Sequence, residues 1–249
     1  MSERVTSDSQ ETALAQYRPY SAAAVVGLLL GAVSVVAFWH PILWCLPVIA
    51  AIANIFALRR ISHFAPELAG RGLTLTGLAL SLIFGIAAPT RLEVVVEARR
   101  AGARNVALQW FAYLRDGEPE KAAQLQLEPR FRKLPGDDVW AYYRHQPKGP
   151  EYIEQFVLAR SVRNLLALGK QAQVRYYQTE VDEVAAHRET MMQLYAVTFE
   201  RDGRPTTFFV RILLQKHLQG DSASRGWWIV RNDLVTQPPE SWAETESTP

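Results

Sequence analysis

Two long stretches of the 249-residue chain, residues 21–58 and 73–90, contain no Asp, Glu, Lys or Arg. An α-helix rises ~1.5 Å per residue and the hydrocarbon core of a bilayer is ~30 Å thick, so the first stretch is long enough for two crossings and the second for one. A buried helix of a soluble protein is the alternative, but a globular core helix does not need such a length without charge. We therefore expect a membrane-integral N-terminal third.

A cleaved signal peptide is a second alternative for residues 1–40. The polar leader is long and contains Glu3, Asp8 and Glu11, and the apolar stretch continues well past the length of a signal peptide's apolar region. An uncleaved anchor fits these features better. We expect residues 1–19 and 238–249 to be disordered tails.

Groups that carry covalent or metal chemistry are scarce. Cys45 is the only cysteine, which excludes a disulfide or a thiolate metal site within one chain. No two histidines are four residues apart, no Gly-x-Ser-x-Gly motif occurs, and Gly27-x-x-x-Gly31 lacks the Lys of a phosphate-binding loop. A net charge of +2 without a block of Lys or Arg gives little reason to expect a nucleic-acid partner. The sequence thus predicts no catalytic residue, no metal and no cofactor.

The first apolar stretch divides at Phe38-Trp39-His40-Pro41, because Pro cannot continue a helix without the loss of a hydrogen bond. We expect a tight hairpin there, with spans at residues 21–38 and 42–58 and a third at 73–90. Trp39 and Trp44 are expected to be interfacial anchors. The predicted module is therefore a three-helix transmembrane bundle.

Small residues recur at every fourth position of the first and third spans, at Ala23, Gly27 and Gly31 and at Gly77, Ser81 and Gly85. Such faces allow helices in lipid to approach closely, and a polar group such as Asn54 can form a hydrogen bond between them. A role for Asn54 in a transport path is the alternative. Helix packing is favoured, since no acid or base accompanies Asn54 in the spans.

Three segments characterise residues 20–90: Tyr20-Ser-Ala-Ala-Ala-Val-Val-Gly-Leu-Leu-Leu-Gly31, Ala57-Leu-Arg-Arg-Ile61 and Gly70-Arg-Gly-Leu-Thr-Leu-Thr-Gly77. Together they resemble the bacterial membrane module called domain of unknown function 4190. The resemblance implies an integral membrane module of bacteria, and it supplies no established activity.

The arginines near the spans predict the orientation of the chain. Arg59, Arg60 and Arg71 flank the short loop between the second and third spans, and such residues favour the cytoplasmic side. With three spans, everything after Thr90 then lies outside the cytoplasm, at the plasma membrane. Four arginines after the third span favour the opposite orientation: Arg91, Arg99, Arg100 and Arg104. The short loop is the cleaner indicator, because Glu93 and Glu97 lie among the later arginines.

The polar part of the chain begins with helical patterns. A long helix is predicted from residue 92, with Val106, Trp110, Phe111 and Leu114 on one face and an end at Asp116-Gly117. A second helix is expected at residues 119–127. A third, capped by Asp137 or Asp138, would contain Val139, Trp140, Tyr142 and Tyr143.

The period then changes to that of strands. We expect strands at residues 174–179, 192–200, 206–217 and 227–231, with a hairpin at Asp202-Gly203. Helices followed by a meander of strands predict an α+β layer fold for residues 91–237, with long helices packed on a curved antiparallel sheet.

Three further segments carry a second resemblance: Ala107-Leu-Gln-Trp-Phe-Ala-Tyr-Leu-Arg-Asp-Gly117, Pro119-Glu-Lys-Ala-Ala123 and Gly226-Trp-Trp-Ile-Val230. They resemble the nuclear transport factor 2-like superfamily, in which a curved sheet wraps a long N-terminal helix as a cone. This resemblance implies the cone-like fold. Members of the superfamily include enzymes, binding modules and scaffolds, so it does not select an activity.

A ligand pocket inside the cone is one hypothesis. Arg175, Tyr177 and Arg211 would hold an anionic ligand between apolar walls formed by Trp110, Phe111 and Tyr142. Core packing and solvation explain the same residues and are favoured. Similarly, Glu180, Asp182 and Glu183 are candidates for cation binding or general-base catalysis, but a solvated strand end is favoured. Of the adjacent Trp227 and Trp228, one is expected in the core and the other at a surface contact.

These observations favour a non-enzymatic, membrane-anchored binding or scaffold protein. Its partners would be the lipid bilayer, an unidentified protein or small ligand and, as an option, another membrane or envelope protein. The alternative is a tethered hydrolase or isomerase that uses Asp182 with Tyr177 or His187. A transport subunit is a third option, but no charged residue lies within a predicted span.

Overall fold

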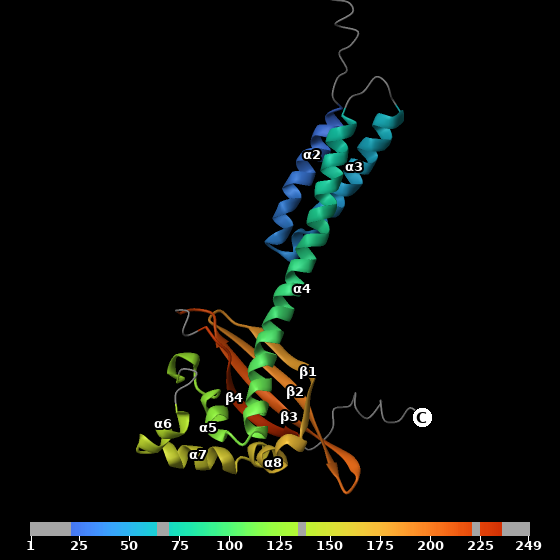
Figure 1. Cartoon of the computed structure of the whole chain (residues 1–249). Coiled ribbons are helices and arrows are strands. Elements are labelled where there is room, and N and C mark those ends of the chain that lie inside the picture. The colour runs from blue at the N-terminus through green and yellow to red at the C-terminus, as the bar shows by residue number, and fades with distance from the viewer. Residues whose placement is uncertain (1–20, 64–69, 134–137, 221–224, 236–249) are drawn as a thin grey trace, which may run out of the picture. The chain divides into compact units, whose positions relative to one another are not determined.

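The computed structural model describes residues 21–63, 70–133, 138–220 and 225–235 (Figure 1). The two predicted tails and Asp137 lie outside the described residues. The chain forms two compact units, Met1–Val96 and Glu97–Pro249. The boundary falls several residues after the one predicted at residue 90.

The first unit contains three helical rods. Helix α2 (Ala22–Val33) continues as η1 (Ser34–Phe38), η2 (Pro41–Trp44) leads into α3 (Cys45–His63), and the third rod is the first part of α4 (Arg71–Arg115). The break between the first two rods is at His40, whose backbone is extended and whose Nδ1 accepts a hydrogen bond from the Ile42 N–H at 3.2 Å. The rods lie side by side in Figure 1.

Two helices of the described chain are long and apolar enough to cross a membrane, Pro41–His63 and Arg71–Arg115. The apolar helix Ala22–Phe38 is shorter. The span predicted at residues 73–90 and the helix predicted from residue 92 are parts of one continuous helix, α4. Pro89 lies inside α4 and has no N–H to donate to the preceding turn of the helix. In the next residue, the Thr90 Oγ1 donates to the Ile86 carbonyl at 2.8 Å, which adds a side-chain hydrogen bond beside the missing backbone one.

The first unit has small and polar side chains inside and large apolar side chains outside, the reverse of the arrangement in water-soluble proteins. Most buried residues are small or polar: Ala24, Gly27, Gly31 and Ser34 in the first rod, Ala50, Asn54 and Ala57 in the second, and Thr74, Gly77 and Ser81 in the third. Large apolar side chains point outward and are 52% to 67% exposed: Val26, Leu29, Val48, Phe56, Ile83 and Ile86. The surface of this bundle is therefore apolar.

The second unit begins with the remainder of α4. This helix ends in a Schellman motif, in which the Glu118 N–H donates to the Tyr113 carbonyl at 2.8 Å and the Gly117 N–H donates to the Leu114 carbonyl at 3.2 Å. Gly117 adopts φ +78°, which a residue without Cβ accepts easily. The predicted helix end at Asp116-Gly117 is confirmed.

Short helices follow α4. They are α5 (Pro119–Gln124), η3 (Pro129–Phe131), α6 (Val139–His145), α7 (Gly149–Leu158), α8 (Arg160–Leu168) and η4 (Gly169–Gln171). The Asp138 Oδ1 caps α6 by accepting from the Ala141 N–H at 2.9 Å, as one of the two predicted caps. Helices α7 and α8 were not predicted.

The sheet is an antiparallel meander in the order β1-β2-β3-β4, with β1 at Gln173–Val184, β2 at Arg188–Arg201, β3 at Arg204–His217 and β4 at Trp228–Val235. The predicted hairpin is confirmed: Asp202 and Gly203 have φ of 53° and 73° and connect the paired residues Arg201 and Arg204. Register shifts in β1 at Tyr177 and Glu180 mark two bulges. The unit thus combines helices with a four-stranded antiparallel sheet.

One face of the sheet packs on α4. Phe111 of α4 contacts Tyr195 of β2 with ring centroids 5.1 Å apart, and Trp110 and Leu114 are fully buried beside them. Trp227 belongs to this core. Trp228 is also only 6% exposed and lies 4.7 Å from the His217 ring, so the expectation that one of the two tryptophans remains available at the surface is wrong.

Arg132 fastens the helical segment to the last strand. Its guanidinium donates to the carbonyls of Leu127 at 3.1 Å, Leu125 at 3.3 Å and Trp227 at 2.7 Å. The Ile229 N–H donates in turn to the Leu125 carbonyl at 2.9 Å. Burial lowers the pKa of Arg132 to about 10, which leaves the group charged at neutral pH.

Candidate functional site

The aromatic side chains expected to line a cone pocket are packed in the core. Trp110 and Phe111 are 0% and 1% exposed and touch each other with ring centroids 5.1 Å apart. Tyr142 is half-buried against Tyr143, with centroids 5.4 Å apart. Trp110 and Phe111 therefore hold the sheet on α4 and leave no room at their own positions for a ligand.

The three polar pocket candidates lie on the other face of the sheet. Tyr177 packs on Phe209, with ring centroids 5.7 Å apart, in a cluster that also contains Leu194 and Ala196. Arg175 is exposed and pairs in register with Ala196. The structure therefore does not bring the six predicted pocket residues together, because the sheet separates Tyr177 from Trp110 and Phe111.

Arg211 on this second face is held by a carboxylate. Its Nε and one terminal nitrogen donate to the two carboxylate oxygens of Glu180 at 2.5 and 3.1 Å, a bidentate pair. The hydrogen bond to Glu180 raises the pKa of Arg211. Arg211 is on β3 and Glu180 is on β1, with β2 between them, so this ion pair links two strands that are not adjacent in the sheet.

The three acids of β1 are distributed over different environments. Glu180 pairs with Arg211, whereas Asp182 faces α4 and contacts Arg100 at 3.0 Å and Arg99 at 3.7 Å. Glu183 is exposed. The expected solvated strand end is therefore wrong for Glu180 and Asp182, which are 18% and 14% exposed in ion pairs. In the described part of the chain, no group of three His, Cys, Asp or Glu is placed to hold a metal ion.

The residues of the enzyme alternative do not converge. Asp182 faces α4, Tyr177 lies on the opposite face of the sheet, and His187 is exposed between β1 and β2. General acid–base catalysis requires groups within hydrogen-bond reach of one substrate. Asp182, Tyr177 and His187 do not meet this requirement together.

A buried polar network between β2 and α4 was missed by the sequence reasoning. The Tyr195 hydroxyl donates to the Gln193 Oε1 at 2.6 Å, and the Gln193 Nε2 donates to the Arg100 carbonyl at 3.2 Å. Both side chains are 0% exposed, and burial raises the pKa of Tyr195, so the phenol stays protonated. The network positions β2 on α4. Its only sequence signal is two polar residues at core-facing positions of one strand.

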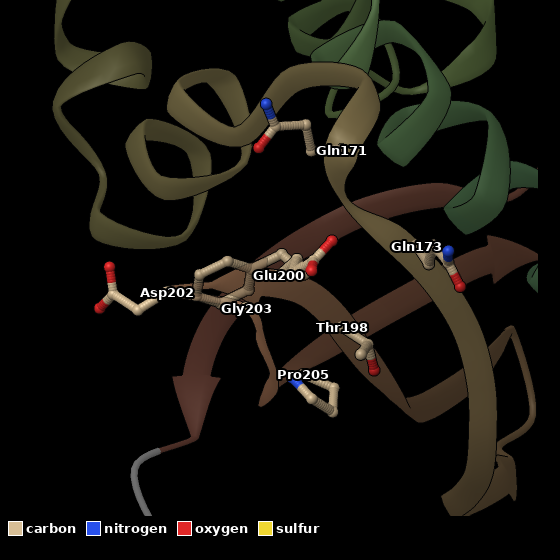
Figure 2. A pocket seen from close by; sticks show the side chains of 8 residues that line it. Gln171, Gln173, Thr198, Glu200, Asp202, Gly203 and Pro205 are labelled. Atoms are coloured by element: carbon tan, nitrogen blue, oxygen red, sulfur yellow. The ribbon is translucent and has the colours of Figure 1, made fainter.

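An open groove lies at the end of the sheet between η4 and the hairpin of β2 and β3 (Figure 2). Its cavity volume is about 670 Å³. The groove is lined by Gln171, Gln173, Thr198, Phe199, Glu200, Asp202, Gly203 and Pro205. In Figure 2, Gln171 lies on one side and Glu200, Asp202 and Pro205 lie on the other.

The chemistry of this groove suits a polar ligand. Amide, hydroxyl and carboxylate groups surround one aromatic ring, and Phe199 contacts Phe208 edge to face with centroids 6.1 Å apart. A second hollow of about 270 Å³ shares Phe199 with the groove and is otherwise lined by Phe208 and by Asn164, Ala167 and Leu168 of α8. The sequence indicates the hairpin but not the groove, because α8 and η4 approach the hairpin only in the folded domain.

The small residues of the first unit lie between helices. A Cβ at Gly77 would come within 2.8 Å of the Gly27 carbonyl and of the Asn54 Oδ1, and a Cβ at Gly31 would collide with the Gly77 carbonyl. Ser81 is buried, and Gly85 is half-buried with Pro47 3.2 Å from where its Cβ would lie. Ala23 is only half-buried, and its neighbour Ala24 is fully buried. Close backbone approach thus joins all three rods.

Asn54 makes the polar contact between the rods. Its Nδ2 donates to the Gly27 carbonyl of the first rod at 2.9 Å and to the Ala50 carbonyl of its own helix at 2.8 Å. Its Oδ1 is buried without a hydrogen-bond partner among the described residues. This geometry uses Asn54 as an interhelical tie.

Comparison of the chain with protein-family models, with curated proteins and with solved structures gives no match.

Proposed function

We propose that this protein is an integral membrane protein whose N-terminal bundle anchors an α+β, cone-like domain, and that this domain binds a protein or small ligand without catalysis. The observation that carries the proposal is the apolar outer surface of the bundle. Fully exposing a Val, Leu, Ile or Phe side chain to water costs about 1.5–3 kcal/mol. A bundle with such residues outside and Gly, Ala, Ser and Asn inside is stable when lipid surrounds it.

All three rods cross the bilayer in this proposal. Helix Ala22–Phe38 is short, but Gly27 and Gly31 seat it against the Asn54 and Gly77 of the longer helices. This helix packs against both longer helices, and its outer side is equally apolar. It therefore lies in the bilayer with them. Three spans also agree with what the resemblance to domain of unknown function 4190 implies, an integral membrane module.

The orientation follows from the loop arginines. Arg59, Arg60 and Arg71 are exposed at the loop end of α3 and α4 and favour the cytoplasm, which assigns the second unit to the other side of the plasma membrane. Alkaline phosphatase fused after Thr90 should be active. Activity of a cytoplasm-only reporter at that site would overturn the orientation. Release of the protein from membranes by alkaline carbonate would overturn membrane anchoring itself.

Binding is favoured over catalysis because the enzyme candidates Asp182, Tyr177 and His187 are dispersed and a polar groove is open at the hairpin. Titration of the second unit with a panel of small polar compounds, followed by amide chemical shifts, should perturb residues 171–173 and 198–205. Turnover of ester or phosphate substrates that is lost in Asp182→Asn, Tyr177→Phe or His187→Ala, with the fold retained, would replace this proposal by the tethered enzyme.

A further inference from the structure

A cavity of about 240 Å³ lies within the first unit, where the turn between η1 and η2 faces α4. Its main lining residues are Phe38, Trp39, Trp44, Arg91, Leu92 and Val95. The cavity is thus apolar and aromatic around one permanent positive charge.

Arg91 has no acidic partner in the described part of the chain. Its guanidinium carbon lies 5.8 Å from the centroid of the Phe38 ring, a cation–π contact, and no ion pair to Arg91 occurs there. His40 also lines the cavity, but its Nδ1 already accepts from the Ile42 N–H. The guanidinium carries five N–H donors, so an anion in this cavity would satisfy donors that the described chain leaves unpaired.

The position of Arg91 along α4 identifies which anion is near. The uncharged residues 73–90 rise about 27 Å, close to the ~30 Å thickness of the hydrocarbon core. Arg91 follows directly, and the apolar Leu92, Val94 and Val95 beyond it are 46%, 60% and 48% exposed. Trp39, 81% exposed on the facing turn, suits the interface as well. With the bundle inserted as proposed above, Arg91 therefore lies at the level of the lipid phosphates.

We propose that this cavity binds one phospholipid. The phosphate accepts hydrogen bonds from the Arg91 guanidinium, and the glycerol region lies against Phe38, Leu92 and Val95 while the acyl chains remain in the bilayer. This site rests on the membrane insertion proposed above. It makes the end of the bundle that contains Arg91 selective for an anionic lipid.

Native mass spectrometry of the full chain in a mild detergent, with phosphatidylglycerol added in steps, tests the site. The wild type should retain one phosphatidylglycerol more tightly than phosphatidylcholine, and Arg91→Gln should bind it roughly tenfold more weakly, because a charge-assisted hydrogen bond is lost. Arg71→Gln is the matched control, since Arg71 is an exposed arginine at the other end of the same span. It should leave the affinity unchanged.

A second variant tests the apolar wall. Leu92→Trp narrows the cavity and retains Arg91, and it should also weaken binding; size-exclusion profiles would show whether both variants stay folded. Excess inorganic phosphate should not displace the lipid. Equal losses in Arg91→Gln and Arg71→Gln, no loss in Arg91→Gln, or displacement by phosphate would overturn the site. Membrane anchoring is judged separately by carbonate extraction.

Discussion

The two units of the chain bury opposite kinds of side chain. In the first, Gly27, Gly77 and Asn54 are inside and Leu29 and Ile86 are outside; in the second, Trp110 and Leu114 are inside and charged residues such as Arg201 and Asp202 are outside. Close backbone contact and an amide hydrogen bond hold the first, whereas removal of apolar area from water holds the second. With the first unit inserted in the membrane as proposed above, the difference teaches that burial of large apolar groups stabilises a fold where the solvent is water, and not where it is lipid.

A Leu→Ala substitution should have very different effects on stability in the two units, and this is the largest difference we expect. Leu114→Ala removes a fully buried side chain from the second unit and should lower its stability by about 2–5 kcal/mol. Leu29→Ala removes a side chain that is 60% exposed in the first unit and should change stability little in detergent. Calorimetry of the full chain in one detergent measures both, and equal shifts would contradict the comparison.

Replacing a glycine by a larger residue tests whether close backbone approach holds the first unit together. Gly77→Leu forces a side chain into the Gly27 backbone and the Asn54 amide, and we expect a loss of about 3 kcal/mol with a lower folded yield. Gly72→Leu in the same helix is the control, because nothing lies within 4 Å of where its Cβ would be. Identical yields of monodisperse protein from the two variants would remove close backbone approach as the cause of packing.

Alkaline pH should weaken the second unit. Burial raises the pKa of Tyr143 to about 12, while an unfolded tyrosine titrates near 10. Between these values the unfolded chain loses a proton that the folded domain keeps, so stability falls as the pH rises from 10 to 12, by at most about 2–3 kcal/mol. Tyr143→Phe should flatten this part of the profile relative to wild type. Urea unfolding at several pH values measures the difference, and parallel profiles would refute the assignment.

The smallest expected effect concerns charge at the sheet. Asp182→Asn leaves Arg99 and Arg100 without their acid and should destabilise the second unit by about 1–2 kcal/mol. Glu183→Gln, at the exposed adjacent position, should be nearly neutral. The midpoint of urea unfolding distinguishes the two variants. A neutral Asp182→Asn would mean that solvent screens this pair completely.

Local rules predicted the elements whose signals are strong over a few residues. The Asp202-Gly203 hairpin, the helix end at Gly117 and the Asp138 cap each follow from the conformational preference of one or two residues. Helix α8 was missed although Val162 and Leu165 have helical spacing, because its nine residues form a short pattern beside the strands. The continuity of α4 was missed since a change of composition at Arg91 looks like a boundary, yet nothing there ends the helix.

Residue chemistry alone did not predict the candidate sites. Arg175, Tyr177 and Arg211 have suitable groups, but the two bulges of β1 and the strand register decide which face each residue occupies. The groove at the hairpin combines η4 with β1, β2 and β3, and only the tertiary fold brings these segments together. In contrast, the small-residue pattern of the first unit could be recognised from the sequence, because residues four apart lie on the same face of a helix.

The bulges at Tyr177 and Glu180 interrupt a strand at the edge of the described sheet. Strand β1 is an edge of the described sheet, and a straight edge of its length would present a regular row of N–H and C=O groups to another chain. Under the membrane anchoring proposed above, molecules confined to one membrane surface would collide repeatedly in nearly fixed orientations, which favours the joining of such edges into aggregates. Two interruptions within one strand break the repeat that a second edge would have to match, and so they disfavour edge-to-edge pairing between copies of the domain.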